Sequence, residues 1–307
     1  MTDPDFASLS CSRLEEASVA VVGLGLMGGS LAAALKVRQA CARVIGIARR
    51  QETAARALAL HYVDEATTEL VAGVANADIV VLAMPVRTIL QMLPDLGRQL
   101  SPGTLLIDLG STKARIAEAM AALPTYVHVC PAHPMCGKES AGLDAADPDL
   151  FVGRTFVVSP LQRTGPDALA LCEALASAVG AQPLRLDPAH HDRLVALTSH
   201  LPYLLALGLM WLADEAAASE PILWHLAASG FRDTSRLAAS DVTMMLDVLM
   251  TNPAAIASAL ARYREHLERV EGLLRAGDEM ALQSLMEAVA RRRRALNLHV
   301  SGQRESA

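Results

Sequence analysis

Residues 19–28 read VAVVGLGLMG, and this stretch decides the fold of the first half of the chain. Its apolar start is typical of a buried strand, and a helical pattern continues from it to residue 39. The glycines between strand and helix, Gly23, Gly25 and Gly28, match G-x-G-x-x-G in the strand–turn–helix context that this pattern requires. Such a turn lets the backbone approach a pyrophosphate and presents helix N–H groups to it, so the stretch predicts a dinucleotide site. A simple tight turn is the alternative.

The same alternation of apolar runs and helical stretches continues for most of the first half. Further strand-like runs follow at residues 43–48, 78–83, 104–109, 126–130, 156–158 and 183–186. Fully apolar runs separated by helices are typical of a parallel sheet that is covered on both faces. The pattern therefore predicts a doubly wound α/β domain with a mostly parallel sheet.

A change of pattern at Asp187-Pro188 marks the predicted domain boundary, because this dipeptide is a helix start signal. From there to Arg294 only helical periodicity occurs, at residues 190–213, 222–228, 242–250 and 253–274 and in a last helix. We predict a nucleotide-binding domain over 17–187, a helical domain over 188–296 and a tail without fixed structure over 297–307. The helical half is rich in Leu, Ala and Met, which predicts burial against a second copy in a homodimer.

Composition excludes several classes of protein. The 307 residues are 52% hydrophobic and 20% charged with a net charge of −6, which excludes a disordered chain and disfavours a nucleic-acid partner. Five scattered cysteines without a CxxC pair, and no apolar leader, indicate a reducing, cytoplasmic setting. Residues 194–213 contain no Asp, Glu, Lys or Arg and are long enough to span a bilayer. A helix in a soluble core is the preferred interpretation, with no membrane partner.

The residues after the second strand bear on the type of dinucleotide. A site specific for NAD usually places Asp or Glu about 20 residues beyond the glycine turn, on the ribose 2′-hydroxyl. Here Ala48 is followed by Arg49 and Arg50, which could bind a 2′-phosphate. We therefore predict NADP, with NAD also possible. The predicted cofactor contacts are Gly23, Leu24, Gly25, Leu26, Met27, Gly28, Ala48, Arg49, Arg50, Met84 and Pro85.

Two polar segments, 108–113 and 131–140, follow strands at the sheet edge where open α/β sheets bind ligands. His133 is predicted to lie on a rigid loop in the second segment, where it could serve as a general base. Cys130, His133 and Cys136 fall three residues apart, so a zinc site is the alternative. We predict no metal, because the spacing does not match a zinc motif.

The helical half contributes two further candidate segments. Residues 199–202 (SHLP) interrupt the long helix with a proline, which is expected to kink it. Residues 229–236 (SGFRDTSR) form a segment with two arginines, and an arginine oriented by Asp233 could bind a carboxylate. A surface ion-pair loop is the alternative for this second segment.

Four segments and one further residue together resemble a known family. They are 110–113 (GSTK), 132–135 (AHPM) with Glu139, 199–202 (SHLP) and 230–236 (GFRDTSR). In order and spacing they are similar to the prephenate/arogenate dehydrogenases of tyrosine biosynthesis, over nearly the whole chain. The resemblance implies an N-terminal Rossmann-type domain, an all-helical C-terminal dimerisation domain and a site between them.

The resemblance also implies roles for individual residues. His133 would be the base on the substrate hydroxyl, and Ser111 would orient both. Arg236 would bind the ring carboxylate. The other residues implied at the substrate site are His200, Lys113, Glu139 and Asp233.

The implied reaction is the oxidative decarboxylation of prephenate to 4-hydroxyphenylpyruvate, an NAD(P)-dependent oxidation of a cyclohexadienyl substrate. Arogenate, which carries an amino group where prephenate carries a keto group, is the first alternative. The glycine turn also occurs in β-hydroxyacid dehydrogenases and imine reductases, and a non-catalytic NADP sensor would need neither His133 nor Arg236.

Overall fold

A computed structural model describes residues 7–138 and 140–302 of the chain, with side chains as far as residue 296. The chain divides into two compact units, Met1–Pro253 and Ala254–Ala307, and each is described by itself. The first unit holds the sheet, and all of the predicted site residues fall within its bounds.

An eight-stranded sheet forms the centre of the first unit, in the order β3-β2-β1-β4-β5-β6-β7-β8. All neighbouring strands are parallel except β6 and β7, so the predicted doubly wound, mostly parallel sheet is confirmed. The short edge strand β3 was not predicted, because its polar sequence EAT lacks an apolar run. The bounds are β1 (Ser18–Val22), β2 (Arg43–Ile47), β3 (Glu65–Thr67), β4 (Ile79–Leu82), β5 (Leu105–Asp108), β6 (His128–Pro134), β7 (Thr155–Val158) and β8 (Gln182–Arg185).

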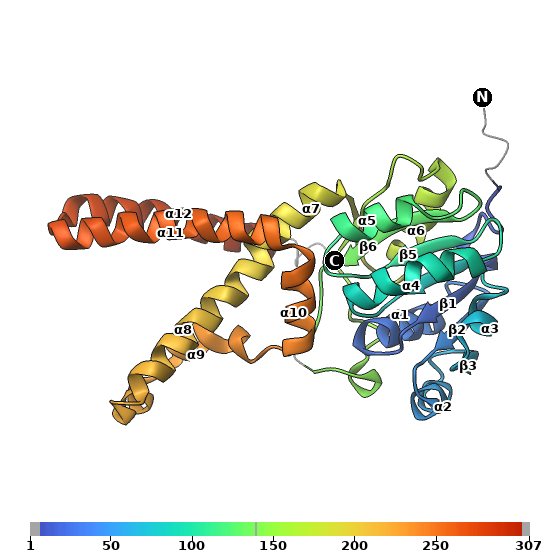
Figure 1. The fold of residues 1–307 in the computed structure, drawn as a ribbon, viewed down its shortest axis with the longest axis horizontal. Coiled ribbons are helices and arrows are strands. Elements are labelled where there is room, and N and C mark those ends of the chain that lie inside the picture. The colour runs from blue at the N-terminus through green and yellow to red at the C-terminus, as the bar shows by residue number, and fades with distance from the viewer. Residues whose placement is uncertain (1–6, 139, 303–307) are drawn as a thin grey trace. The chain divides into compact units, whose positions relative to one another are not determined.

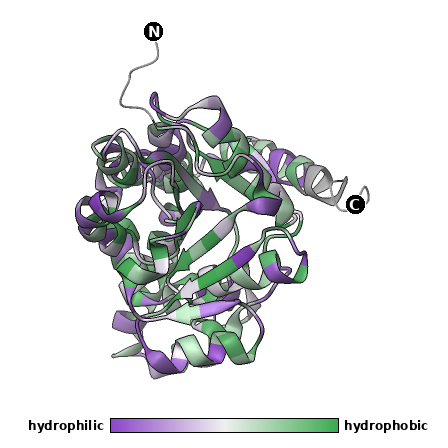
Figure 2. Ribbon diagram, turned by 90° about the vertical axis from the view of Figure 1, so that its right-hand side faces the viewer, coloured by the Kyte–Doolittle hydropathy of each residue, from purple (hydrophilic) through white to green (hydrophobic). Residues whose placement is uncertain are grey.

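Alternate residues of each central strand enter two different cores, one on each face of the sheet. Val19 and Val21 of β1 pack in one core with α1, α2 and α6, whereas Ala20 and Val22 pack in the other with α3, α4 and α5. Figure 1 shows helices on both faces, and Figure 2 shows hydrophobic colour running through the strands. The bounds are α1 (Leu26–Val37), α2 (Gln51–Ala59), α3 (Leu70–Val74), α4 (Val86–Gln99), α5 (Ala114–Ala121) and α6 (Pro166–Ala178).

Strand β6 changes partner along its length, and this corrects the predicted position of His133. Residues 128–131 pair in parallel with β5, and residues 132–134 then pair antiparallel with β7, with His133 opposite Val157. The sequence placed His133 on a loop because prolines flank the segment. Each half of β6 pairs with only one neighbouring strand. A proline, which has no N–H to donate to a second strand, can therefore be accommodated. His133 is therefore held by a sheet instead of a loop.

The helical part of the first unit begins as the sequence predicts. The Asp187 side chain accepts a hydrogen bond from the His190 N–H at 2.9 Å and caps α7 (Pro188–Val195). A π-helical turn over Ala196–His200 leads into α8 (Leu201–Ala217). The predicted interruption thus lies one turn before Pro202, which sits in the first turn of α8, where its missing N–H is tolerated. Single π turns of this kind are frequent at functional sites.

Two assignments after α8 differ from the sequence prediction. The predicted helix over 222–228 is a 3₁₀ helix, Pro221–Leu226. Residues 229–236 were predicted to bind a carboxylate, with a surface ion-pair loop as the alternative. They form helix α9 (Ser229–Ser235) and the start of a 3₁₀ turn (Arg236–Ala239), and α10 (Val242–Thr251) comes next. Polar residues enter α9 because the Thr234 and Ser235 hydroxyls donate to carbonyls one turn earlier, at 2.8 and 2.7 Å.

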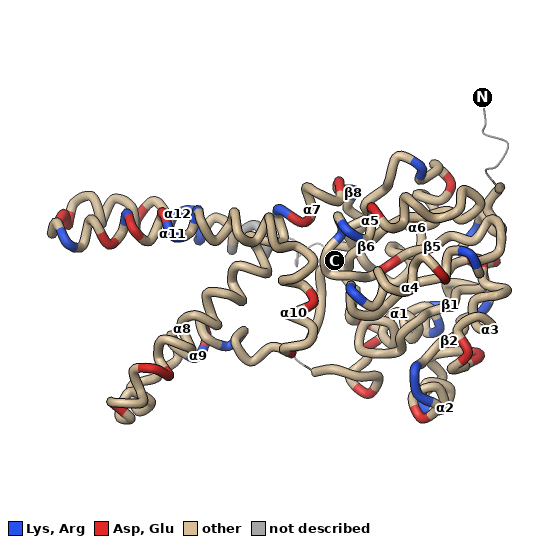
Figure 3. Tube along the Cα trace, in the orientation of Figure 1, with Lys and Arg blue, Asp and Glu red and all other residues tan. Residues whose placement is uncertain are grey.

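The continuous helical run Pro188–Ala217 is long and apolar enough to cross a membrane by length and composition alone. Within one chain only 33% of its most apolar 18-residue window is buried. The prediction of a helix buried in a soluble core is therefore confirmed only in part. Figure 3 shows α8 without charge over most of its length. Its outer half exposes Trp211 and Leu212, at 67% and 66%.

The second unit is a pair of helices, α11 (Pro253–Ala276) and α12 (Glu279–Gly302), which lie side by side in Figure 1. Gly277 joins them with a positive φ of 62°, and its N–H bonds to the Leu274 carbonyl at 3.2 Å. Helix α12 continues beyond the predicted end at Arg294, into the segment predicted as a tail. The rest of that tail, residues 303–307, lies outside the described residues.

Candidate active site

The glycine turn after β1 has the geometry of an anion site at the start of α1. Gly23 has a φ of +99°, and a Cβ there would meet the Ala83 carbonyl oxygen at 2.6 Å. A Cβ at Gly28 would meet the Gly23 carbonyl oxygen at 2.0 Å, so packing within the chain explains both glycines. A Cβ at Gly25 would meet nothing within 4 Å, and α1 has no side-chain cap. The open side of Gly25 and the uncapped N-terminus fit the approach of a pyrophosphate.

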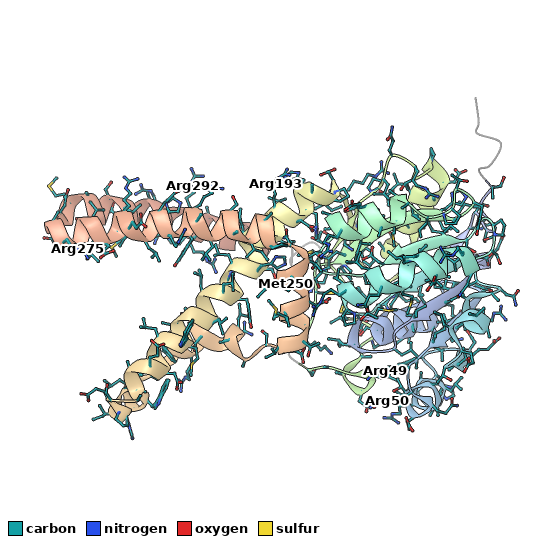
Figure 4. The ribbon with its side chains drawn as sticks, viewed as in Figure 1. Arg49, Arg50, Arg193, Met250, Arg275 and Arg292 are labelled. Carbon is teal, nitrogen blue, oxygen red and sulfur yellow. The ribbon has the colours of Figure 1, made fainter. Side chains whose placement is uncertain are left out.

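Neighbouring strands bring the other predicted cofactor contacts to the same sheet edge. The Gly23 N–H donates to the Ile47 carbonyl at 2.9 Å, which places the end of β2 beside the turn. Arg49 and Arg50 are exposed and lie where β2 leads into α2 (Figure 4). Met84 follows β4, and its Cβ lies 3.5 Å from the position of a Cβ built on Gly23.

The loop after β5 is organised around a fully buried ion pair between Asp108 and Lys113, both 0% exposed. Asp108 also accepts hydrogen bonds from the N–H groups of Gly110 at 2.8 Å and Ala132 at 3.2 Å. Burial raises the pKa of Asp108 and lowers the pKa of Lys113, because each charged form loses water. The sequence placed Lys113 at the substrate pocket. In the structure it has no exposed surface and instead joins the loop to β6 through Asp108.

The N-termini of α4 and α5, on one face of the sheet, are capped by carboxylates from α10 and α7. Arg87, in the first turn of α4, donates its N–H to both carboxylate oxygens of Asp247 in α10 at 3.2 Å. At α5, the N–H groups of Lys113 and Ala114 donate to Asp192 of α7 at 2.7 and 2.9 Å. Neither helix has a side-chain cap of its own, and an N-terminal cap contributes about 1 kcal/mol to stability.

His133 lies at the centre of a cluster of polar side chains at the end of β6. Its Nδ1 is 2.9 Å from Nε2 of His191, whose own Nδ1 is 2.8 Å from Oδ1 of Asp192. Burial, with further contributions from His191, Lys113 and His200, holds the pKa of His133 well below 6.5. His133 is therefore neutral near pH 7, which is the form that accepts a proton.

His200 closes the π turn before α8 and belongs to the same cluster. Its Nδ1 is 3.5 Å from Nδ2 of Asn252, and that amide donates to the backbone carbonyl of Asp192 at 2.8 Å. Burial lowers the pKa of His200 to about 4, although Asp192 opposes this shift. The π turn thus brings a second neutral imidazole to the cluster around Asp192.

The remaining predicted substrate residues lie on other elements. Ser111 is half-buried in the β5–α5 loop. Asp233 on α9 and Arg236 on the following turn are exposed, and both short helices pack against α8. Glu139 lies outside the described residues. Among the residues that the structure describes, no three His, Cys, Asp or Glu side chains are arranged to hold a metal ion.

Three buried residues that organise this cluster, His191, Asp192 and Asn252, were not predicted from the sequence. The adjacent pair His191-Asp192 was visible just inside the predicted helix start at Asp187. Adjacent polar residues on a helix normally face different directions, so no local pattern indicated that both would be buried.

Comparison with known protein families agrees with this arrangement. Residues 31–184 match the family model "Prephenate dehydrogenase, nucleotide-binding domain", and residues 187–288 match "Prephenate dehydrogenase, dimerization domain". The chain belongs to the prephenate dehydrogenase family. The resemblance stated from the four sequence segments is therefore confirmed.

Individual relatives in the family cover nearly all of the chain. A prephenate dehydrogenase from Lactococcus lactis is 32% identical over 284 residues, covering 92% of this chain and 78% of the relative. The crystal structure of Synechocystis arogenate dehydrogenase has a TM-score of 0.80 at 32% identity, covering 91% of this chain and 99% of that one. Prephenate dehydrogenase from Aquifex aeolicus, in complex with hydroxyphenyl propionate and NAD+, has a TM-score of 0.86 at 26% identity and covers 94% and 99%.

Membership of the family makes the chain an NAD(P)-dependent oxidoreductase that acts on a cyclohexadienyl substrate. Its cofactor is a nicotinamide dinucleotide, and the open, uncapped turn at Gly25 fits the pyrophosphate of such a group.

Proposed function

We propose that this chain catalyses the oxidative decarboxylation of prephenate to 4-hydroxyphenylpyruvate with NADP+ as the hydride acceptor. The observation that carries the proposal is His133. It is a neutral imidazole held at the end of β6, on the same sheet whose strands position the glycine turn. Two curated relatives that match over 92% and 83% of the chain are prephenate dehydrogenases, which favours prephenate over arogenate, and a third that matches over 85% is a cyclohexadienyl dehydrogenase.

In the proposed mechanism His133 accepts the proton of the substrate hydroxyl as hydride departs from the same ring carbon. The bound nicotinamide supplies the acceptor for that hydride. The hydroxyl carbon becomes a carbonyl, and the ring carboxylate on the opposite carbon then leaves as CO₂. The electrons of the broken C–C bond enter the ring, the carbonyl oxygen becomes a phenol oxygen, and the proton held by His133 can return to it. Aromaticity makes the step essentially irreversible.

The other site residues hold the substrate around this base. Ser111 orients the hydroxyl, and Arg236 binds the ring carboxylate through its guanidinium. We assign His200, Asp233 and Glu139 to the substrate site, with His200 contributing a neutral ring next to the His133 cluster. Lys113 acts indirectly, because its ion pair with Asp108 shapes the loop that carries Ser111.

A side-by-side assay of the two substrates tests the proposed activity. We expect NADPH formation with prephenate at a higher kcat/KM than with arogenate. The measurement is the initial rate at 340 nm over a range of each substrate, with the product identified chromatographically as 4-hydroxyphenylpyruvate or tyrosine. A higher kcat/KM with arogenate would assign the chain to the alternative substrate, and turnover of neither would contradict the proposal.

The choice of NADP rests on the two arginines after β2. Arg49→Ala should lower kcat/KM with NADP about 10-fold, because a charge-assisted contact to the 2′-phosphate is lost, and should leave kcat/KM with NAD nearly unchanged. Arg38→Ala is the matched control. This arginine is bound to Asp149 at 2.7 Å, away from the turn, and its loss should not change the ratio between cofactors. Equal use of NADP and NAD by the unchanged protein would contradict the prediction.

We also propose that the chain forms a homodimer through its helical part. The apolar outer half of α8 supports this, because Trp211 and Leu212 lack cover within one chain. The nucleotide-binding domain would extend over 17–187 and the helical substrate and dimerisation domain over 188–296. Five free cysteines support a reducing, cytoplasmic setting.

A further inference from the structure

Hydrogen bonds link the side chains of His133, His191 and Asp192 in a row that leads inward from His133. His133 comes from β6, while His191 and Asp192 come from α7. The two imidazole rings meet edge to face, with centroids 5.1 Å apart and planes inclined by 74°. His191 is fully buried and Asp192 is almost so, whereas His133 is only partly buried.

The donor and acceptor of each hydrogen bond follow from Asp192, at the inner end of this row. The carboxylate of Asp192 accepts from the backbone N–H groups of Lys113 at 2.7 Å and Ala114 at 2.9 Å, and these groups can only donate. An ionised carboxylate has acceptors only, so the third contact must be a donation from His191 Nδ1–H to Oδ1. In the neutral form of His191 this places the single ring proton on Nδ1.

The outer hydrogen bond is then determined as well. With its proton on Nδ1, neutral His191 offers a lone pair at Nε2, and that atom lies 2.9 Å from Nδ1 of His133. Opposite this neutral form of His191, His133 donates from Nδ1, so its own proton lies on Nδ1 and its lone pair on Nε2. We propose that His191 and Asp192 are positioning residues that fix His133 in the tautomer whose Nε2 can accept the substrate proton.

Among the residues that the structure describes, the other groups that influence His133 have partners of their own. The ammonium group of Lys113 is paired with Asp108, and His200 faces Asn252. After proton transfer both nitrogens of His133 carry protons. The Nδ1–H bond to His191 is retained, and the negative charge of Asp192 lies at the inner end of the hydrogen-bonded row.

This inference rests on the proposed role of His133, and two substitutions at His191 separate orientation from structural support. His191→Gln places an amide oxygen near the former Nε2 position, where it can still accept from His133. His191→Asn places its amide near the former Nδ1 position, where it can still donate to Asp192 but cannot reach His133. If His191 positions the base, the Asn variant should lose about 100-fold in kcat and the Gln variant less than about 10-fold, with KM for cofactor unchanged in both.

If His191 had a purely structural role, kcat of the Asn variant would be higher than kcat of the Gln variant, because the Asn variant preserves the contact to Asp192. Equal or higher kcat in the Asn variant, or kcat within about 3-fold of the unchanged protein in both, would overturn the inference. His133→Ala is measured in parallel. If it leaves kcat unchanged, the proposed base itself has failed. If it lowers kcat while both His191 variants remain active, only the positioning role has failed.

The tautomer can also be measured without any substitution at His191. In the full chain labelled with ¹⁵N-histidine, the ring resonances of His133 are assigned by their loss in His133→Ala. Near pH 7 we expect a protonated Nδ1 and an unprotonated Nε2 for His133. The opposite tautomer, or a mixture of both, would overturn the inference even if the variants failed to fold.

Discussion

His133→Ala should lower kcat with prephenate by about 10²–10⁴-fold, the range that a positioned general base contributes. The expected loss is large because His133 is the only partly exposed imidazole of the described cluster, whereas His191 and His200 are buried behind it. The ammonium group of Lys113 is buried in its ion pair, and His200 is itself buried beside Asn252. Steady-state kinetics with saturating cofactor measure the effect, and unchanged kcat would exclude His133 as the base.

Arg236→Ala is the informative comparison for this variant. The substrate carboxylate is charged before and during the reaction, so Arg236 stabilises the ground state and the transition state alike. Its loss should raise KM more than it lowers kcat, the reverse of the pattern expected for His133.

The pH profile of the unchanged protein gives a second measure of the same base. Burial and the neighbouring His191, Lys113 and His200 lower the pKa of His133, so the active neutral form persists well below pH 6.5. The decline of kcat/KM that is due to this base should therefore begin only below pH 6.5 as the solution is acidified. A decline centred above pH 6.5 would indicate a different base.

Lys113→Met should reduce the free energy of unfolding by about 3–5 kcal/mol, the cost of leaving one partner of a buried ion pair uncompensated. Asp108 would keep its hydrogen bonds from Gly110 and Ala132, yet its charge would remain fully buried without the ammonium group. Denaturant unfolding followed by circular dichroism measures the change.

Lys138→Met is the matched control for this substitution. Lys138 pairs with Asp147 at 2.8 Å, but both side chains are more than one-third exposed, so solvent screens the interaction. Its loss should leave stability close to that of the unchanged protein. If Lys113→Met were no more destabilising than Lys138→Met, the buried pair would not have the structural role described above.

The sequence was sufficient for the sheet because its strands are short apolar runs with alternate residues in two cores. Val19 and Val21 on one face, with Ala20 and Val22 on the other, need no distant information to be recognised as a doubly covered strand. The glycine turn was equally readable, since the spacing of Gly23, Gly25 and Gly28 reflects constraints within one short segment. The polar strand β3 was not predicted, because its pairing with β2, and not its own sequence, places it in the sheet.

The candidate site was only partly predictable because its polar contacts join residues far apart in the chain. Spacing and family resemblance pointed to His133 and His200, but nothing local links Asp192 to the N–H groups of Lys113 and Ala114. Buried charge was the other difficulty. The family resemblance implies that Lys113 lines the substrate pocket, whereas in the structure its ammonium group is buried in an ion pair with Asp108.

The carboxylate caps of α4 and α5 have a consequence for recombining members of this family. Asp192 and Asp247 belong to the helical segments, yet they complete two helices of the nucleotide-binding part. A chimera that takes its sheet from one relative and its helices from another would inherit only one side of each contact. Grafting a new helical half to alter substrate choice would therefore require an acceptor at both positions, in register with the N–H groups of Arg87, Lys113 and Ala114.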